Sequence, residues 1–342
     1  MPIGDQYMEA ARSLRPFNDR LLLTGAGFAK PWEGYLASEF GDHLISDRTL
    51  STNHPRVHDL LLETTAFEDA LAEVEITRCA EFSDAERTGL REAVRRAFQL
   101  HDHNLCQNGT GASMLLNRFV ERFIDNSNNR TAPLFTTNQD LMLERYYTGG
   151  NSPHVVVPCV RRQGWWLGGQ SSSPWLNHIQ NPREARAAVT FSVEQYVKQI
   201  ATRLSYIKLH GSLDWRLGDD EVLVIGGGKK ESIERLPILG MSFAVFRAAL
   251  TLATNAHLLI IGYGFSDPHI NSVIAEGVEK AGLKVSIVDP MPRDVMRDRL
   301  KQKGCALVGK GLSGYYTRPL REEVLREGTG EWKKLMESFF GR

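Results

Sequence analysis

Short apolar runs recur along the chain, and each of them ends in small or polar residues. Four are typical of buried parallel strands: Arg20–Gly27 (RLLLTGAG), Ala132–Asn138 (APLFTTN), His257–Gly264 (HLLIIGYG) and Lys284–Pro290 (KVSIVDP). The stretch Tyr206–Gly211 (YIKLHG) is a fifth candidate. Runs without alternation indicate strands that are buried on both faces, as in a parallel sheet covered by helices. The pattern therefore predicts an α/β fold.

Between the first two predicted strands, apolar residues recur at helical spacing from about residue 36 to 129. The segment contains SDAE at Ser83–Glu86, a capping box in which the serine and the glutamate satisfy free backbone N–H groups at a helix start. A simple crossover between parallel strands is much shorter. We therefore expect a helical insertion in the α/β domain.

A second irregular zone covers residues 149–186 and is rich in Gly, Ser and Trp. It predicts a loop or hairpin insert. Trp165, Trp166 and Trp175 are expected to fill a small satellite core, or alternatively to wall a pocket or a protein interface. The sequence thus predicts one domain over residues 1–318, with both inserts, followed by a C-terminal helix over 319–342.

Composition and charge exclude several classes of function. The 342 residues include 41 basic and 41 acidic ones, so there is no basic excess of the kind that marks direct nucleic-acid binding. The amino terminus lacks the apolar core of a secretory signal, and no apolar run is long enough to cross a membrane. We expect a cytoplasmic protein.

Several common catalytic and metal motifs are absent from the sequence. The four cysteines form no C-x-x-C pair, so neither zinc nor a disulfide framework is expected. GGGKKES at Gly226–Ser232 lacks the spacing of a phosphate-binding P-loop. The His101–His103 pair (HDH) is predicted on a surface helix, where side chains two residues apart diverge, so no metal site is expected there.

Two predicted strands end in candidate binding residues. GAGFAK at Gly25–Lys30 resembles a dinucleotide-binding turn, whose backbone N–H groups approach a phosphate closely. Lys30 replaces the third glycine of that pattern, so a plain tight turn is an equal alternative. TTNQD at Thr136–Asp140 offers an amide and a carboxylate for a ribose or a water, or else a helix cap.

Three further strand ends carry candidate chemistry. His210 follows an apolar run, at the strand end where open α/β sheets keep their chemistry, and a strand-end histidine that only hydrogen-bonds a loop is the alternative. An ordinary pKa near 6.5 would suit it as a general base. Gly262 permits the backbone to approach a ligand closely, and Ser266 and Asp267 could cap a helix that begins at Pro268. Asp289 could accept a hydrogen bond from an adenosine ribose, or be a solvated turn residue.

The motifs GAGF, TTNQD, KLHGSLDW and GYGFSDPHI, in this order, resemble the sirtuin superfamily. They are more closely similar to the sirtuin-like domains of prokaryotic antiphage defence proteins. The resemblance implies a Rossmann-like parallel sheet with NAD+ as the substrate. It also implies catalytic roles for Asn138 and His210. The cofactor-binding residues that it implies are Gly25, Ala26, Gly27, Phe28, Thr137, Asp140, Gly262, Ser266, Asp267 and Asp289.

Departures from the deacetylating sirtuins favour one branch of the family. Thr137 stands where those enzymes usually carry glutamine, and the cysteine pairs of their zinc module are missing. The resemblance therefore implies an NAD+ glycohydrolase that releases nicotinamide and ADP-ribose. The alternatives are an NAD- or ADP-ribose-binding sensor module, and a protein deacylase or ADP-ribosyltransferase. A dehydrogenase is disfavoured by the altered glycine loop.

An unregulated enzyme of this kind would kill its host. We therefore expect control through a homo-oligomer or through a co-encoded regulatory protein. The resemblance suggests a HerA-type ATPase or a nucleotide-processing protein as that partner. The expected role is an effector of abortive antiphage infection through NAD+ depletion.

Overall fold

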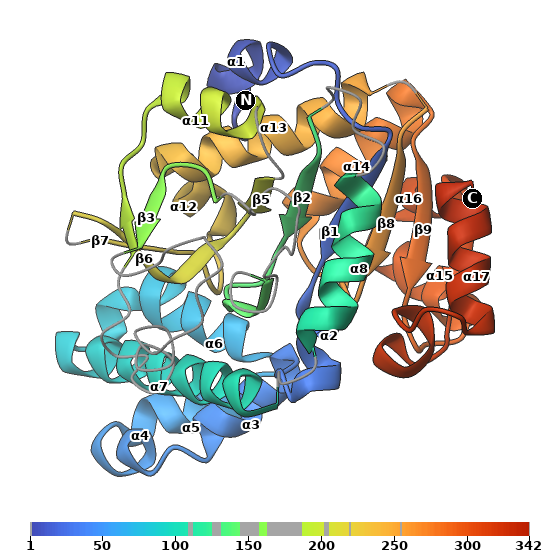
Figure 1. Ribbon diagram of the computed structural model, residues 1–342. Coiled ribbons are helices and arrows are strands. Elements are labelled where there is room, and N and C mark those ends of the chain that lie inside the picture. Colours follow the sequence, from blue (N-terminus) through green and yellow to red (C-terminus); the bar gives the residue numbers. More distant parts are fainter. Residues whose placement is uncertain are drawn as a thin grey trace, which may run out of the picture.

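Six strands form one parallel sheet in the computed structural model, in the order β10-β9-β8-β1-β2-β5 (Figure 1). Their bounds are β1 Arg20–Thr24, β2 Pro133–Thr136, β5 Ser205–Lys208, β8 His257–Ile261, β9 Lys284–Val288 and β10 Leu312–Tyr316. The five predicted strands are confirmed; β10 was not predicted. The structure describes residues 2–108, 112–124, 131–143, 157–162, 187–201, 205–218, 220–253 and 255–341.

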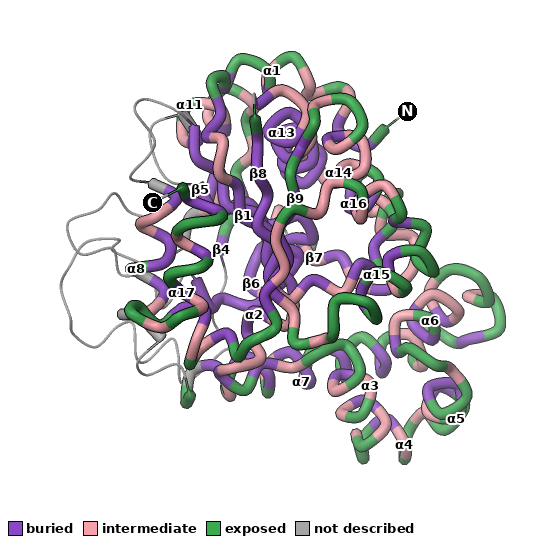
Figure 2. Tube along the Cα trace, turned by 90° about the vertical axis from the view of Figure 1, so that its right-hand side faces the viewer, coloured by how far each residue is buried: buried purple, intermediate pink, exposed green. Residues whose placement is uncertain are grey.

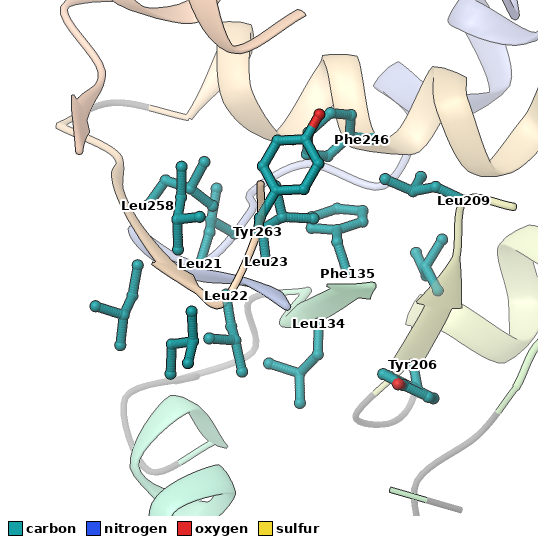
Figure 3. Close-up of a cluster of buried hydrophobic side chains, with 14 of the residues drawn as sticks. Leu21, Leu22, Leu23, Leu134, Phe135, Tyr206, Leu209, Phe246, Leu258 and Tyr263 are labelled. Atoms are coloured by element: carbon teal, nitrogen blue, oxygen red, sulfur yellow. The ribbon is translucent and has the colours of Figure 1, made fainter. Parts of the chain in front are cut away.

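Burial on both faces explains why the strands are apolar throughout. Leu21, Leu22 and Leu23 of β1 are fully buried although their side chains alternate between the two faces of the sheet. Figure 3 shows these leucines among apolar side chains from β2, β5 and β8. On one face Phe135 of β2 packs against Phe246, with 4.9 Å between the ring centroids.

The strand order places a switch point in the middle of the sheet. Along the chain, β1, β2 and β5 progress in one direction from the centre, and β8, β9 and β10 in the other. This is the doubly wound order of dinucleotide-binding folds. In such sheets ligands bind outside the carboxyl ends of the strands, at the point where the direction reverses. Here that point lies between β1 and β8.

Helices cover both faces of the sheet. Helices α13 and α14 lie on one face, whereas α8 and α17 lie on the other (Figures 1 and 2). In the C-terminal segment Trp332, Leu335 and Phe339 are buried. The helices outside the insertion are α1 Met8–Arg12, α2 Ala26–Ala29, α8 Ala112–Ile124, α11 Val193–Ala201, α12 Lys229–Arg235, α13 Pro237–Leu252, α14 Pro268–Ala281, α15 Arg293–Gln302, α16 Ala306–Lys310 and α17 Gly330–Leu335.

The helical insertion has its own core. Its helices are α3 Ala37–Ile45, α4 Arg48–Asn53, α5 Pro55–Glu63, α6 Phe67–Ala72 and α7 Asp84–Asn108. The buried apolar side chains from Phe40 to Phe98 form a cluster separate from the main core. Those of α8, such as Phe119 and Phe123, join the main core instead. Figure 1 places the insertion beyond the carboxyl end of β1, next to α2.

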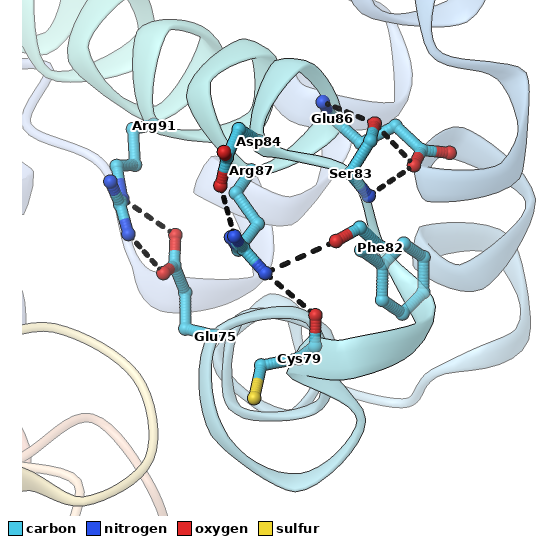
Figure 4. Close-up of polar contacts among 8 residues, drawn as sticks. All are labelled: Glu75, Cys79, Phe82, Ser83, Asp84, Glu86, Arg87 and Arg91. Atoms are coloured by element: carbon cyan, nitrogen blue, oxygen red, sulfur yellow. Dashed lines mark hydrogen bonds and ion pairs between the residues drawn. The ribbon is translucent and has the colours of Figure 1, made fainter.

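The predicted capping box at the start of α7 is confirmed. The backbone N–H of Glu86 donates to Ser83 Oγ at 3.3 Å, and the N–H of Ser83 donates to Glu86 Oε2 at 2.8 Å (Figure 4). We expect Ser83→Ala to lower the free energy of unfolding by about 1 kcal/mol, since a helix N–H loses its acceptor. Urea unfolding measures the change. Ser51→Ala removes an exposed hydroxyl that only bonds back within α4, and an equal effect there would contradict a specific capping role.

A smaller sheet lies beside the main one, in the order β3-β4-β6-β7. Its strands are β3 Val160–Arg162, β4 Ala187–Val189, β6 Gly211–Leu217 and β7 Asp220–Leu223. The glycines at 226–228, which follow β7, lead into α12. The tryptophans at 165, 166 and 175 lie outside the described residues, so their predicted role stays a prediction.

Three glycines join β1 to β8 by backbone contact. Gly262 has a positive φ of 63°, and a Cβ atom on it would lie 2.4 Å from the carbonyl carbon of Gly27. A Cβ on Gly27 would in turn lie 2.8 Å from the Cα of Gly262, and one on Gly25 would lie 2.7 Å from the Gly262 carbonyl oxygen. The two glycine motifs therefore fit together because neither carries a side chain there.

Replacing Gly262 with alanine is expected to lower the free energy of unfolding by about 2–3 kcal/mol, because the left-handed backbone and the backbone clash both penalise a side chain. Thermal or urea unfolding measures the loss. Gly304→Ala is the matched control, since Gly304 also has a positive φ, of 71°, but no neighbour within 4 Å of a Cβ. Equal losses in the two variants would show that the close packing contributes nothing.

Among the described residues no single helix is long and apolar enough to span a membrane. Taken together, helices α12 and α13 have the length and apolar composition of a membrane span, but the pair is bent by 108° between them.

Candidate functional site

Residues at the carboxyl ends of the central strands lie in one row. Ile261 of β8 pairs with Thr24 of β1, Thr24 with Thr136 of β2, and Thr136 with Lys208 of β5. Each of the four sequence motifs continues from one of these positions. The register of the sheet therefore brings the motifs to one edge, at the switch point between β1 and β8 and beside it.

Asn138 and His210 lie next to each other at this edge. Thr136 of β2 pairs with Lys208 of β5. Asn138 and His210 each lie two positions after one of these residues, so they occupy equivalent positions beyond the two strands. The N–H of Leu209 donates to the carbonyl of Thr136 at 2.9 Å, which continues the pairing beyond the strands. Asn138 is 7% exposed, and within the described part of the chain no hydrogen bond engages its side-chain amide. That amide is therefore available to a ligand.

Gly211 fixes the chain immediately after His210. It has a φ of 77°, and a Cβ atom there would lie 2.0 Å from the carbonyl oxygen of Val222 in the β6–β7 hairpin. The N–H of Val224 donates to the carbonyl of His210 at 2.9 Å. The histidine backbone is therefore held between the main sheet and the smaller one.

The His210 side chain is buried and neutral. It is 2% exposed, and burial lowers its pKa to about 3. The expectation of an ordinary pKa near 6.5 is therefore wrong for the ligand-free site, since the interior disfavours the imidazolium. The ring bonds to the backbone carbonyl of Thr137, while its Nε2 lies 2.9 Å from Nε2 of His269.

His269, Lys229 and Glu68 are site residues that the sequence analysis missed. Lys229 Nζ donates to Asp267 Oδ1 at 2.8 Å and to Glu68 Oε1 at 2.7 Å. Burial alone would lower the pKa of Lys229, but the two carboxylates outweigh it and raise that pKa. Lys229 begins α12, His269 lies in α14, and Glu68 comes from α6 of the insertion. Only the fold brings them together: His269 lies in the GYGFSDPHI motif but was not named as a site residue, and Glu68 and Lys229 lie in none of the four motifs.

Asp267 has a different role from the expected helix cap. Helix α14 begins at Pro268 as predicted, but the Asp267 side chain makes no capping hydrogen bond. Its carboxylate binds Lys229 instead. Burial would raise the pKa of Asp267, but the ammonium of Lys229, which donates to its carboxylate, holds that pKa below the ordinary value. Asp267 is therefore an ionised carboxylate beside the two histidines.

Asp140 lies in a buried polar network under the site. Its Oδ1 accepts from the N–H of Met142 at 2.9 Å, but the helix that it was predicted to cap lies mostly outside the described residues. His101 Nε2 lies 3.8 Å from its carboxylate, and Lys208 donates to its backbone carbonyl. Burial would raise the pKa of Asp140, but His101 and Lys208 outweigh it and lower that pKa. His101 is 4% exposed, so the expectation of a surface position for it was wrong.

The GAGF loop uses most of its backbone donors within the protein. The N–H of Gly25 donates to Ile261, that of Gly27 to Gly262, and that of Phe28 to Gly25. The expectation that these amides are free to hold a pyrophosphate therefore needs correction. The glycines permit the contact with Gly262, and Ala26 is the loop residue whose amide is not in such a bond among the described residues. A cofactor contact of this loop stays a prediction.

The remaining predicted site residues differ in surroundings. Thr137 is 9% exposed, and its hydroxyl faces the carbonyl of Thr24 at 3.4 Å. Ser266 is exposed. Asp289 follows β9, its Oδ1 accepts from the N–H of Met291 at 2.9 Å, and burial raises its pKa. Asp289 lies four strands from His210, about 19 Å at roughly 4.8 Å per strand.

A cavity of about 710 Å³ opens beside the two histidines. It is lined by Lys229 of α12, Phe243 of α13 and His269 of α14, together with Ser266 and Asp267. Its volume is typical of a small-molecule site. Of the four motifs, GYGFSDPHI lines this cavity, whereas Asn138, His210 and the GAGF loop do not.

Comparison with known proteins gives one family match. A model of a SIR2-like domain matches residues 133–308, just over half of the chain. The matched part contains Asn138, His210 and Asp267. A search of the curated proteins finds no match. Among solved structures, that of Sir2Tm bound to a propionylated peptide is similar over 97% of this chain and 96% of that chain, with 13% identity and a TM-score of 0.34.

Proposed function

Because the chain belongs to the family of SIR2-like domain proteins, an NAD-related enzyme family, we propose that it is an NAD+ glycohydrolase. The observation that carries the proposal is the register of β2 and β5. It brings the amide of Asn138 beside the neutral imidazole of His210 at the carboxyl edge of the sheet. A pure binding module needs no general base at that place.

The reaction breaks the bond between nicotinamide and C1′ of its ribose, and a water oxygen then bonds to C1′. Nicotinamide and ADP-ribose leave, and one proton is released. As in other glycosyl transfers, the transition state has oxocarbenium character. Asn138 positions the water or the departing nicotinamide. His210 accepts the proton of the water, directly or through a ribose hydroxyl.

Electrostatics support this assignment of His210. Its bond to the Thr137 carbonyl orients the ring, and burial keeps it neutral, so Nε2 can accept a proton once its hydrogen bond with Nε2 of His269 is released. The ionised Asp267 is close to His210 and favours the imidazolium that forms during the reaction. Burial alone makes His210 a weak base, and the carboxylate of Asp267 offsets part of that effect.

We propose that the chain acts as an effector of antiphage defence by depleting NAD+. The support is the resemblance of its four motifs to sirtuin-like domains of such systems. Control then comes from a homo-oligomer or from a co-encoded partner, such as a HerA-type ATPase or a nucleotide-processing protein. The helical insertion is the surface proposed for that contact, since it lies next to the site (Figure 1).

The test is NAD+ consumption by the full chain, alone and co-expressed with its genomic neighbours, before and during phage infection. A fall in NAD+ together with the appearance of nicotinamide and ADP-ribose is expected. Protection against phage at constant NAD+ would favour a sensor module instead. Loss of NAD+ only in the presence of an acylated peptide would favour a deacylase.

A further inference from the structure

Two histidines and one aspartate converge next to the cavity. His210, His269 and Asp267 each present a ligand atom, and these three atoms lie within 4.8 Å of one another. They come from the end of β5 and from the start of α14, which are about sixty residues apart in the chain. Imidazole nitrogen and carboxylate oxygen are the ligands of catalytic zinc and of related divalent ions.

We propose that these three residues form a binding site for a divalent transition-metal ion, and that the bound ion switches off the NADase. The 2.9 Å between Nε2 of His210 and Nε2 of His269 is shorter by about 0.4 Å than the roughly 3.3–3.4 Å between two nitrogen ligands on a tetrahedral ion at about 2.0–2.1 Å from each, so the rings need only a small separation to admit an ion. The ion therefore fits where a shared proton now joins the two rings. Its entry displaces that proton, and one ring changes its tautomer.

The surroundings hold the ligands as metal sites require. The backbone carbonyl of Thr137 bonds to the His210 ring, a contact of the kind that orients histidine ligands, and Nε2 of His210 faces His269. Lys229 orients the carboxylate of Asp267 at 2.8 Å in the same way. A carboxylate has about four lone-pair positions, so it can accept from Lys229 and bind an ion together. Glu68, 2.7 Å from Lys229, offsets the charge of the ammonium.

The site also has an open side. His269 and Asp267 line the cavity of about 710 Å³, so an ion can enter from there and keep a water as its fourth ligand. Binding occupies the lone pair with which His210 would accept a proton. This consequence for catalysis depends on the proposed function, whereas the metal site itself depends only on the geometry.

The first experiment measures binding to the full chain after removal of metal with a chelator. Co2+ is the probe, because tetrahedral Co2+ absorbs visible light, and Zn2+ is the competitor. Wild type is expected to bind one equivalent that Zn2+ displaces. His269→Gln and Asp267→Asn should each weaken binding by roughly tenfold or more. His103→Gln, which removes an exposed histidine of α7, should bind like wild type.

Melting temperatures of the metal-free variants establish that each one is folded. If wild type binds no Co2+, or if His269→Gln binds it as tightly as wild type, the metal site is overturned. Because this binding experiment needs no catalysis, it tests the metal site even if the chain never consumes NAD+.

The second experiment measures NAD+ consumption with and without Zn2+, each variant relative to its own metal-free rate. Zn2+ at the concentration that saturates wild type should lower the wild-type rate by at least about tenfold and leave the relative rate of His269→Gln unchanged. An active wild type that Zn2+ does not inhibit, or that Zn2+ activates, would overturn the switch. Absence of NAD+ consumption under every condition would instead refute the proposed function.

Discussion

Replacing Asn138 or His210 with alanine is expected to slow NAD+ consumption by about 10²–10⁴-fold, the usual contribution of a positioned acid–base group. Without His210, no group at the end of β5 accepts the proton of the attacking water. Without Asn138, the water and the nicotinamide lose the amide that is available to them at the end of β2. Because the two act on the same step, the double variant should be little slower than the worse single one.

Initial rates of nicotinamide release by the full chain, with its partner if one is required, measure this effect. Asn53→Ala and His103→Ala remove the same kinds of side chain from exposed positions in the insertion, and both should keep the wild-type rate. Rates of Asn138→Ala and His210→Ala within a factor of two or three of wild type, in an active preparation, would show that the active site lies elsewhere.

Replacing Asp140 with alanine is expected to lower the free energy of unfolding by about 3–5 kcal/mol, the typical cost of removing one partner from a buried ion pair. The carboxylate is buried with His101 and Lys208, and it also caps the N–H of Met142. The variant leaves the Lys208 ammonium, which is fully buried, without this counter-charge.

Urea unfolding at neutral pH measures the loss, and its pH dependence identifies the cause. Because the folded-state pKa of Asp140 is below the ordinary value of 3.8, its contribution is complete above that value. It disappears as the pH falls through the lower, folded-state pKa, so wild type and variant should converge in acid. Asp298→Ala removes an exposed surface ion pair and should change stability by less than about 0.5 kcal/mol. A similar loss in both variants would contradict the role of the buried network.

The sheet could be predicted because its strands are buried on both faces. Runs such as Leu21–Leu23 carry that signal without any knowledge of their neighbours. Strand β10 was not predicted because it lies at the edge of the sheet, where Leu312 to Tyr315 are partly exposed. Ser and Gly also interrupt its apolar run. Amphipathic periodicity predicted α8, but periodicity does not say which core a helix joins.

The candidate site could be predicted only where a residue follows a strand. Asn138 and His210 belong to motifs at strand ends, and the register then places them side by side. Lys229 does not, because long-range packing of α12 brings it to the site. His269 lies in the GYGFSDPHI motif, but inside α14 rather than directly after β8, so its position did not single it out. The glycines of GAGF illustrate a further limit: a sequence shows that a side chain is absent, but not whether a ligand or another backbone fills the space.

The separate core of the insertion affects the fraction of molecules in which the site is fully assembled. A cluster that shares few contacts with the main core opens and closes as its own cooperative unit in hydrogen exchange. Two of its helices reach the site, α6 through Glu68 on Lys229 and α7 through His101 beside Asp140. Each transient opening of the insertion therefore disconnects the site from two of its supports. The fraction of molecules in which both supports are in place is set by the local opening equilibrium of the insertion, and any protein that binds its outer surface changes that fraction without touching the sheet.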